Sequence, residues 1–172
     1  MARYYRRKGF VIAAEDEATF GLIPILSRGW AKVGSHPVAN MNFKHKYVKV
    51  MGTRSQRSFV FTFGKRNNKL RFVEFMGKIL RRWGKVLFMV DHAPYHKGKE
   101  IDEFLRRHKK TFKILYFPRR TPELNPVEQC WKPARQVLSN RLLRTLPAAE
   151  YHLRKTFNNH KVLPKMFQFL SN

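Results

Sequence analysis

The feature that most constrains the fold is an unbroken apolar run, Val86–Val90, which ends on Asp91. A run of strand length without polar alternation is typical of a strand buried on both faces of a sheet. Because Pro94 follows closely and proline restricts its predecessor and removes a ladder donor, we expect the strand to end near Asp91. Open α/β sheets place their ligand sites at the carboxyl ends of strands. Asp91 is therefore a candidate catalytic residue, with capping of the next helix as the alternative role.

The charge of the chain indicates a polyanionic partner. The 172 residues include 36 Lys and Arg against 11 Asp and Glu, for a formal net charge of +25. Lys and Arg attract phosphate whatever the base sequence, so nucleic acid is the first candidate partner. The hydrophobic fraction of 43% and the 15 Phe residues exclude a disordered basic tail and predict one folded domain.

Two other features narrow the class of protein. Cys130 is the only cysteine, which excludes an intrachain disulfide and a thiolate zinc cluster. The apolar run at 10–14 is too short for a signal peptide, and no segment approaches the length of a membrane span. We expect no membrane partner and a cytoplasmic or chromosome-associated (nucleoid) protein.

The first half of the chain is typical of a strand meander. A buried strand over 9–14 is expected to end on the acids Glu15–Glu17, and a second strand is expected over 20–26, where Pro24 favours an edge position. Two β-rich runs, 47–52 and 58–63, predict a hairpin.

The second half alternates helices and strands. The expected elements are a basic amphipathic helix over 68–83 that Gly84 ends, the strand 86–90, a helix over 99–109, a strand over 112–117 and a helix from Pro126 capped by Asn125. A further basic helix is expected around 148–157, followed by an apolar tail over 162–170.

Glu128 lies in the helix that follows Pro126. The apolar stripe of that helix includes Val127 and Trp131, so Glu128 projects from another face, shared with Lys132 and Arg135. Surface ion pairing is the common role for such a glutamate. The alternative is a metal ligand whose neighbouring cations hold a nucleic-acid backbone.

This order of elements is that of a ribonuclease-H-like (retroviral-integrase-like) α/β fold, a mixed sheet flanked by helices. Crossover connections would place the strand that ends at Asp91 beside the first strand, so that Asp16 and Asp91 end adjacent parallel strands. The helix after the last strand would bring Glu128 to the same edge. Three converging carboxylates need a hard cation, and Mg²⁺ or Mn²⁺ with oxygen ligands is the natural occupant.

Three sequence blocks carry a family resemblance: DEATF at Asp16–Phe20, VDHAPYHK at Val90–Lys97 and TPELNPVEQCW at Thr121–Trp131. They resemble the catalytic blocks of the DDE transposases of the mariner superfamily, specifically the prokaryotic insertion-sequence branch. The resemblance covers about residues 11–138.

The resemblance implies that Asp16, Asp91 and Glu128 hold two Mg²⁺ or Mn²⁺ ions for DNA cleavage and strand transfer, with transposon ends and target DNA as partners. The family's usual Asn after the second aspartate is replaced by His92, and His96 stands at the family's usual histidine position. The residues expected to contact DNA are His92, His96, Lys97, Arg119, Arg120, Lys132 and Arg135. Glu17 should point to the opposite face of its strand from Asp16 and is at most a supporting residue.

We expect residues 1–172 to be a single DDE catalytic domain, with a core over about 10–140 and a helical extension over 141–172. Full transposases of this kind carry helix-turn-helix domains before the catalytic domain, whereas here the first catalytic strand begins near residue 1. We therefore expect a homodimer on DNA and a separately encoded helix-turn-helix subunit, or a truncated copy. Two alternatives stay open: a basic nucleic-acid-binding protein without chemistry, and a ribonuclease-H-like nuclease.

Overall fold

The computed structural model describes residues 1–38, 40–56, 58–159 and 161. Its centre is a five-stranded mixed sheet in the order β3-β2-β1-β4-β5. Strands β1, β2 and β3 form an antiparallel meander, and β4 and β5 run parallel to β1. The strands are β1 (Val11–Gly21), β2 (Tyr47–Ser55), β3 (Phe59–Gly64), β4 (Val86–Val90) and β5 (Phe112–Tyr116). The predicted hairpin and the predicted place of β4 beside the first strand are confirmed.

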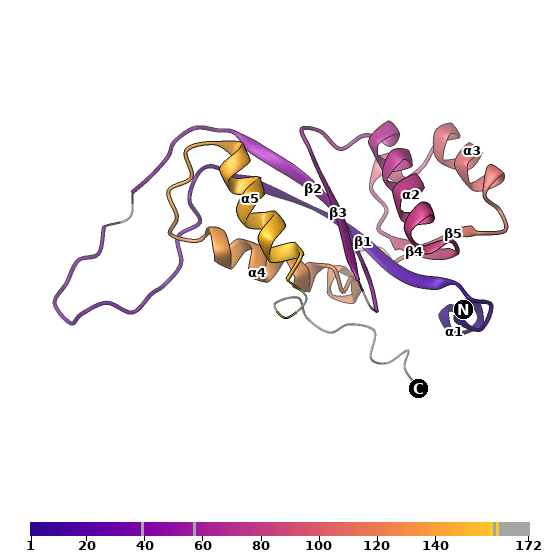
Figure 1. Cartoon of the computed structure of the whole chain (residues 1–172), viewed down its shortest axis with the longest axis horizontal. Helices are drawn as coiled ribbons and strands as arrows, with labels where there is room; N and C mark the ends of the chain where they lie inside the picture. The colour runs from indigo at the N-terminus through magenta and orange to yellow at the C-terminus, as the bar shows by residue number, and fades with distance from the viewer. Residues whose placement is uncertain (39, 57, 160, 162–172) are drawn as a thin grey trace.

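Helices cover both faces of the sheet, as Figure 1 shows. The helices are α1 (Ala2–Arg7), α2 (Lys69–Trp83), α3 (Lys99–Arg107), α4 (Glu128–Leu138) and α5 (Leu146–Phe157). Helices α2 and α3 pack on one face, and α4 and α5 pack on the other. Within the described residues, no helix has the length and apolar character that crossing a bilayer requires. The apolar tail predicted over 162–170 lies outside the described residues.

The first strand is longer than predicted, and the separate strand expected over 20–26 is wrong. Strand β1 is 11 residues long and continues through the three acids to Gly21. The physical reason is the partner on its other side: β2 pairs with β1 from Ala13 to Gly21, whereas β4 pairs only as far as Ala14. The backbone beyond Ala14 therefore keeps a ladder partner, and Asp16 lies within the strand rather than at its end.

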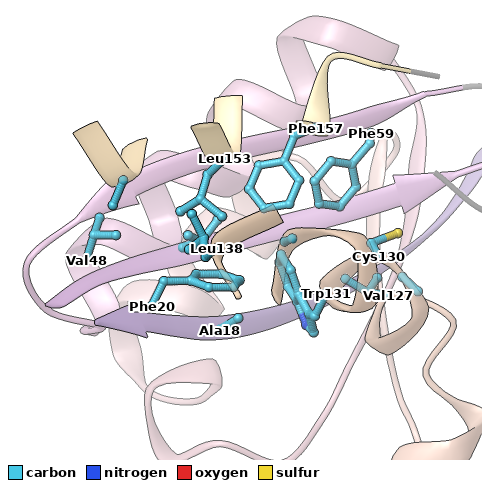
Figure 2. Packing of buried hydrophobic residues seen from close by; sticks show 14 of the residues in the cluster. Ala18, Phe20, Val48, Phe59, Val127, Cys130, Trp131, Leu138, Leu153 and Phe157 are labelled. Carbon is cyan, nitrogen blue, oxygen red and sulfur yellow. The ribbon is translucent and has the colours of Figure 1, made fainter. Parts of the chain in front are cut away.

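Alternation along the strands separates two apolar cores. On β1, Ile12, Ala14 and Phe20 contribute to the core beneath α4 and α5, whereas Ala13 contributes to the core beneath α2 and α3. Figure 2 shows the first core, in which the rings of Trp131, Phe59 and Phe157 meet. Because successive side chains point to opposite faces, Asp16 lies on the α4 side of β1, and Glu15 and Glu17 lie on the α2 side.

The ends of α2 follow from local sequence. The Asn68 side chain accepts a hydrogen bond from the backbone N–H of Arg71 at 2.9 Å, which satisfies one of the free donors of the first turn. Gly84 ends the helix with φ of +75°, a backbone conformation that glycine adopts without strain. The predicted helix over 68–83 is confirmed.

Candidate active site

One cavity of about 480 Å³ opens at the edge of the sheet where β4 ends. It brings together the three carboxylates that the sequence predicted as a triad, Asp16, Asp91 and Glu128. The full lining is Asp16, Asp91, His92, Ala93, Phe117, Pro118, Arg119, Arg120, Thr121, Pro122, Asn125 and Glu128.

The position of the acids follows from strand register and alternation. Ala14 of β1 pairs with Met89 of β4, so Asp16 and Asp91 lie two residues further along neighbouring strands. Side chains two residues apart on a strand point to the same face, so Asp16 and Asp91 lie on the α4 side, as Ala14 and Met89 do. Glu128 is the first residue of α4, which packs on the same face.

Asp16 is held by an indole. Trp131 of α4 donates a hydrogen bond from Nε1 to Oδ2 of Asp16 at 2.7 Å. Gly52 of β2 pairs with Asp16, and a Cβ at that glycine would lie 2.6 Å from the Trp131 ring. Burial raises the pKa of Asp16 to about 7; the indole hydrogen bond opposes this shift, and the nearby charge of Glu128 adds to it. A cation placed beside this carboxyl would favour its ionised form.

Asp91 is held through one of its two oxygens. Oδ1 accepts a hydrogen bond from the backbone N–H of Ala93 at 2.9 Å and lies 2.9 Å from Nδ1 of His96. The hydrogen bond from His96 lowers the pKa of Asp91 below its ordinary value. Its side chain is 53% exposed, so the carboxylate is anchored and still open to solvent.

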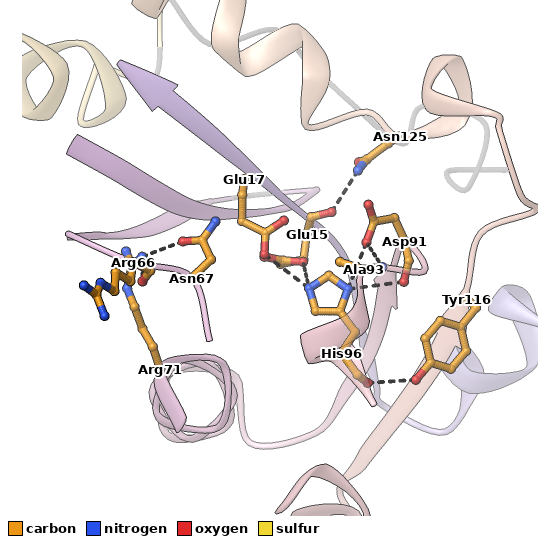
Figure 3. Close-up of polar contacts among 10 residues, drawn as sticks. All are labelled: Glu15, Glu17, Arg66, Asn67, Arg71, Asp91, Ala93, His96, Tyr116 and Asn125. Atoms are coloured by element: carbon orange, nitrogen blue, oxygen red, sulfur yellow. Dashed lines mark hydrogen bonds and ion pairs between the residues drawn. The ribbon is translucent and has the colours of Figure 1, made fainter. Parts of the chain in front are cut away.

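His96 lies inside the protein, and the prediction that it contacts DNA is wrong. Its side chain is 0% exposed because the short 3₁₀ helix Pro94–His96 turns the ring inward under the sheet. Nε2 lies 3.2 Å from Oε1 of Glu17 and 3.5 Å from Oε2 of Glu15 (Figure 3). Burial disfavours the charged ring, but the hydrogen bonds to Asp91 and Glu17 prevail and raise the pKa of His96 to about 10.

Glu15 and Glu17 form a second acidic group on the α2 side of the sheet. One ligand atom from each of Glu15, Glu17 and His96 lies within 4.8 Å of the others. Glu15 is fully buried, and burial raises its pKa well above the ordinary value, with the charge of Glu17 adding to the shift. Glu17 and Asp16 therefore point to opposite faces of β1, as expected from strand alternation.

The connection into α4 differs from the prediction. The helix begins at Glu128 rather than Pro126, and Asn125 is not its capping residue. Instead the Asn125 amide donates from Nδ2 to the Glu15 carbonyl at 2.8 Å, while its Oδ1 accepts from the Val127 backbone at 3.1 Å. Asn125 thus joins the start of α4 to β1 beside Asp16.

The environment of Glu128 bears on the two roles left open for it. Among the described residues, no ion pair joins Glu128 to Lys132 or Arg135. Glu128 is half-buried and lines the cavity, whereas Lys132 and Arg135 are exposed and do not. The arrangement favours a ligand role over surface ion pairing.

The predicted DNA contacts divide into two groups. His92, Arg119 and Arg120 line the cavity, whereas Lys97 is exposed outside it, as are the two cations of α4. The His92 ring stacks on Tyr116 with centroids 5.2 Å apart, and its Nε2 lies 2.8 Å from the Phe117 carbonyl. Because a carbonyl oxygen only accepts, Nε2 of His92 is the donor in this contact.

The residues around the cavity fit a hard divalent cation. The ligand atoms offered are carboxylate oxygens, which Mg²⁺ and Mn²⁺ prefer. The charge of Glu128 adds to the raised pKa of Asp16, so a cation between the two carboxylates would relieve their repulsion. Cys130, the only cysteine of the sequence, is buried in the core rather than at the cavity.

Three supporting residues were not predicted from the sequence: Trp131 and Gly52 around Asp16, and Glu15 beneath His96. Trp131 was identified as part of an apolar stripe and of the third sequence block, but neither pattern shows that its N–H reaches an acid 115 positions away. The available signal was its place in the block TPELNPVEQCW, three residues after Glu128. No sequence signal identifies Gly52, because its role depends on the Trp131 ring that packs against it in the fold.

Comparisons with known proteins agree with this geometry. A family model described as "DDE superfamily endonuclease" matches residues 12–149. No curated protein sequence matches the chain.

Solved structures of Mos1 transposase share the fold. The mariner Mos1 paired-end complex with Mg has a TM-score of 0.71 at 18% identity, covering 93% of this chain and 52% of that one. The Mos1 paired-end complex with the left transposon end has a TM-score of 0.69 at 17% identity, covering 92% and 51%. The catalytic domain of Mos1 mariner transposase has a TM-score of 0.65 at 15% identity, covering 92% and 75%. The ribonuclease-H-like fold is confirmed, and the chain spans about half the length of the Mos1 chains in the complexes.

Proposed function

The chain belongs to the DDE superfamily of endonucleases, and from that premise we propose that it is the catalytic domain of a transposase that cleaves DNA and transfers the cut strand. The observation that carries the proposal is the convergence of Asp16, Asp91 and Glu128 on one cavity with Arg119 and Arg120 at its rim. We place it in the prokaryotic insertion-sequence branch of the mariner superfamily because of its three sequence blocks.

In this proposal Asp16, Asp91 and Glu128 hold two Mg²⁺ or Mn²⁺ ions. Bound there, the ions would supply Lewis-acid activation of water or of a 3′-hydroxyl and would stabilise the leaving oxygen. The protein's part is to orient the carboxylates: Trp131 holds Asp16, and Ala93 and His96 hold Asp91. Mos1 complexes that contain Mg or Mn support the choice of metal.

The proposed partners are transposon ends and target DNA. Mos1 structures include a complex with a transposon end and a strand transfer complex, and this chain shares their fold and carries a net charge of +25. We propose that it acts as a homodimer on DNA at the nucleoid. Recognition of the ends would come from helix-turn-helix segments outside these 172 residues, on a separate subunit or elsewhere in a longer protein.

The test is a joining assay with Mg²⁺, a labelled duplex with a free 3′-hydroxyl from the DNA flanking the gene, and a supercoiled target plasmid. A transposase joins the labelled strand to the plasmid. A nuclease nicks the plasmid without joining, and a binding protein without chemistry does neither; either result would refute the proposal.

The decisive variant is Asp91→Asn, which keeps the shape of the residue and removes the charge that holds a metal. We expect product formation to fall by about 10³-fold or more, because removal of a metal-holding charge removes transition-state stabilisation. DNA binding in a gel-shift assay should stay within about twofold of wild type, because phosphate contacts of Lys and Arg dominate affinity. Equal activity of the variant and the wild type would contradict a metal role for Asp91.

A further inference from the structure

His96 joins two acidic groups that lie on opposite faces of the sheet. On one side its Nδ1 lies 2.9 Å from Oδ1 of Asp91 and 3.2 Å from the Asp91 carbonyl. On the other side its Nε2 lies 3.2 Å from Oε1 of Glu17. Both ring nitrogens therefore lie within hydrogen-bond distance of a carboxylate oxygen, and the ring connects Asp91 to Glu17 of β1 (Figure 3).

The ring has little freedom to move. Phe72 lies across it with ring centroids 4.3 Å apart, and Tyr95 meets it edge-on at 4.7 Å. The His96 carbonyl accepts a hydrogen bond from the Tyr116 hydroxyl at 2.9 Å, which ties the same residue to β5. Because the His96 side chain is 0% exposed and packed against these rings, it restricts the position of the groups to which it hydrogen-bonds.

The hydrogen bonds of Asp91 are one-sided. Within the described part of the chain, both hydrogen bonds to its carboxylate, from Ala93 and from His96, go to Oδ1. Oδ2 is left as the oxygen available to a ligand. Asp91 is otherwise half exposed at a strand end, where a carboxylate without such anchors would sample several rotamers.

We propose that His96 is a positioning residue for the metal site: it fixes Oδ1 of Asp91 against Glu17 of β1, so that Oδ2 is presented to a divalent ion. The inference rests on the proposed function. Outer hydrogen-bond partners of metal ligands commonly change metal affinity by about 10- to 100-fold when removed. His96 touches neither substrate nor metal in this assignment, and its effect passes through Asp91.

Two amide substitutions separate the two hydrogen bonds of the ring. In His96→Asn the amide nitrogen can take the place of Nδ1 and keep the donor toward Asp91. In His96→Gln it can take the place of Nε2 and keep the donor toward Glu17. Both variants lose the charge and the aromatic packing, so a purely structural role predicts similar effects from the two.

The measurement is Mn²⁺ affinity by isothermal titration calorimetry, with the melting temperature without metal recorded in parallel. We expect His96→Gln to weaken Mn²⁺ binding by about tenfold and His96→Asn, which loses only the contact to Glu17, by about threefold. Equal Mn²⁺ affinities of the two variants would overturn the inference. If neither variant folds, Glu17→Gln decides: it removes the charge that orients Nε2, and unchanged Mn²⁺ affinity would overturn the inference as well.

Asp91→Asn distinguishes failure of the inference from failure of the proposed function. If Asp91→Asn binds Mn²⁺ as wild type does, the triad is not the metal site and both proposals fall. If Asp91→Asn loses Mn²⁺ while the two His96 variants stay equal, only the positioning role falls. If an Mn²⁺ site persists in Asp91→Asn and is lost in both His96 variants, the ion sits among Glu15, Glu17 and His96, which also overturns the inference.

Discussion

At the scale of single residues, Glu15 lies in an environment that opposes its charge. Its side chain is fully buried, and within the described residues neither carboxylate oxygen has a hydrogen-bond partner. His96 lies 3.5 Å away and offsets part of the cost, but burial still raises the pKa of Glu15 well above its ordinary value of 4.5. A group that binds its proton more tightly when folded makes the folded state less stable as pH rises above the unfolded pKa.

Glu15→Gln should therefore stabilise the protein at neutral and higher pH. At about pH 8, in EDTA, we expect the free energy of unfolding to increase by about 1–3 kcal/mol, because the substitution removes a charge that burial penalises. At about pH 4.5 the gain should shrink, because Glu15 is then largely protonated when folded and the substitution removes little charge. Urea unfolding at the two pH values measures this. Glu74→Gln, at an exposed glutamate of α2, is the matched control and should change little at either pH. A destabilised Glu15→Gln at about pH 8 would contradict the argument.

At the scale of elements, the pairing of β1 with β2 and the packing of α4 meet at one point. Gly52 of β2 faces Asp16 of β1, and the space left by its missing side chain is filled by Trp131 and Phe59. A Cβ at Gly52 would lie 2.6 Å from atoms of both rings. Since Trp131 also donates to Asp16, any shift of the ring reaches the cavity.

Gly52→Ala should consequently weaken both the fold and the metal site. We expect a loss of about 1–3 kcal/mol in unfolding free energy, as for other overpacked cores. Mn²⁺ affinity should fall by about tenfold, because the hydrogen bond to a metal ligand is displaced. Calorimetric titration and urea unfolding test the two effects. Phe61→Leu, which alters the same aromatic cluster through the rings of Phe59 and Phe157, should lose stability and keep its Mn²⁺ affinity. Normal Mn²⁺ affinity in Gly52→Ala would show that the glycine serves packing alone.

Elements that depend on residues close together in the sequence could be predicted, whereas features that depend on residues far apart could not. The run Val86–Val90 and the stripe of α2 have local signals, apolar continuity and helical spacing, and both were predicted correctly. The length of β1 depends on pairing with β2, whose partner residues lie 26 to 42 positions further along the chain, and the strand predicted over 20–26 was wrong for that reason. The contacts of His96, likewise, join residues from separate elements, and no local pattern shows that its ring is buried.

At the scale of the whole molecule, the few acids are concentrated around the site. Five of the 11 Asp and Glu residues, namely Glu15, Asp16, Glu17, Asp91 and Glu128, lie at the cavity or in the His96 network. The chain as a whole carries 36 Lys and Arg. This distribution separates two tasks: the general positive field attracts the phosphate backbone, and the local negative patch attracts the cations that act on it.

From this distribution of charge we predict which Lys and Arg side chains set the salt dependence of DNA binding. If DNA crosses the cavity rim, the pair Arg119→Gln and Arg120→Gln removes two phosphate contacts and lowers the slope of log affinity against log salt by about 1.8. The matched control is Arg106→Gln with Lys109→Gln, two exposed cations at the end of α3 on the opposite face of the sheet, for which the change in slope should be small. Fluorescence anisotropy with a short duplex over a range of KCl concentrations measures the slopes. An equal or larger fall in the α3 pair would place DNA on the other face, away from the three carboxylates, because both pairs remove the same charge.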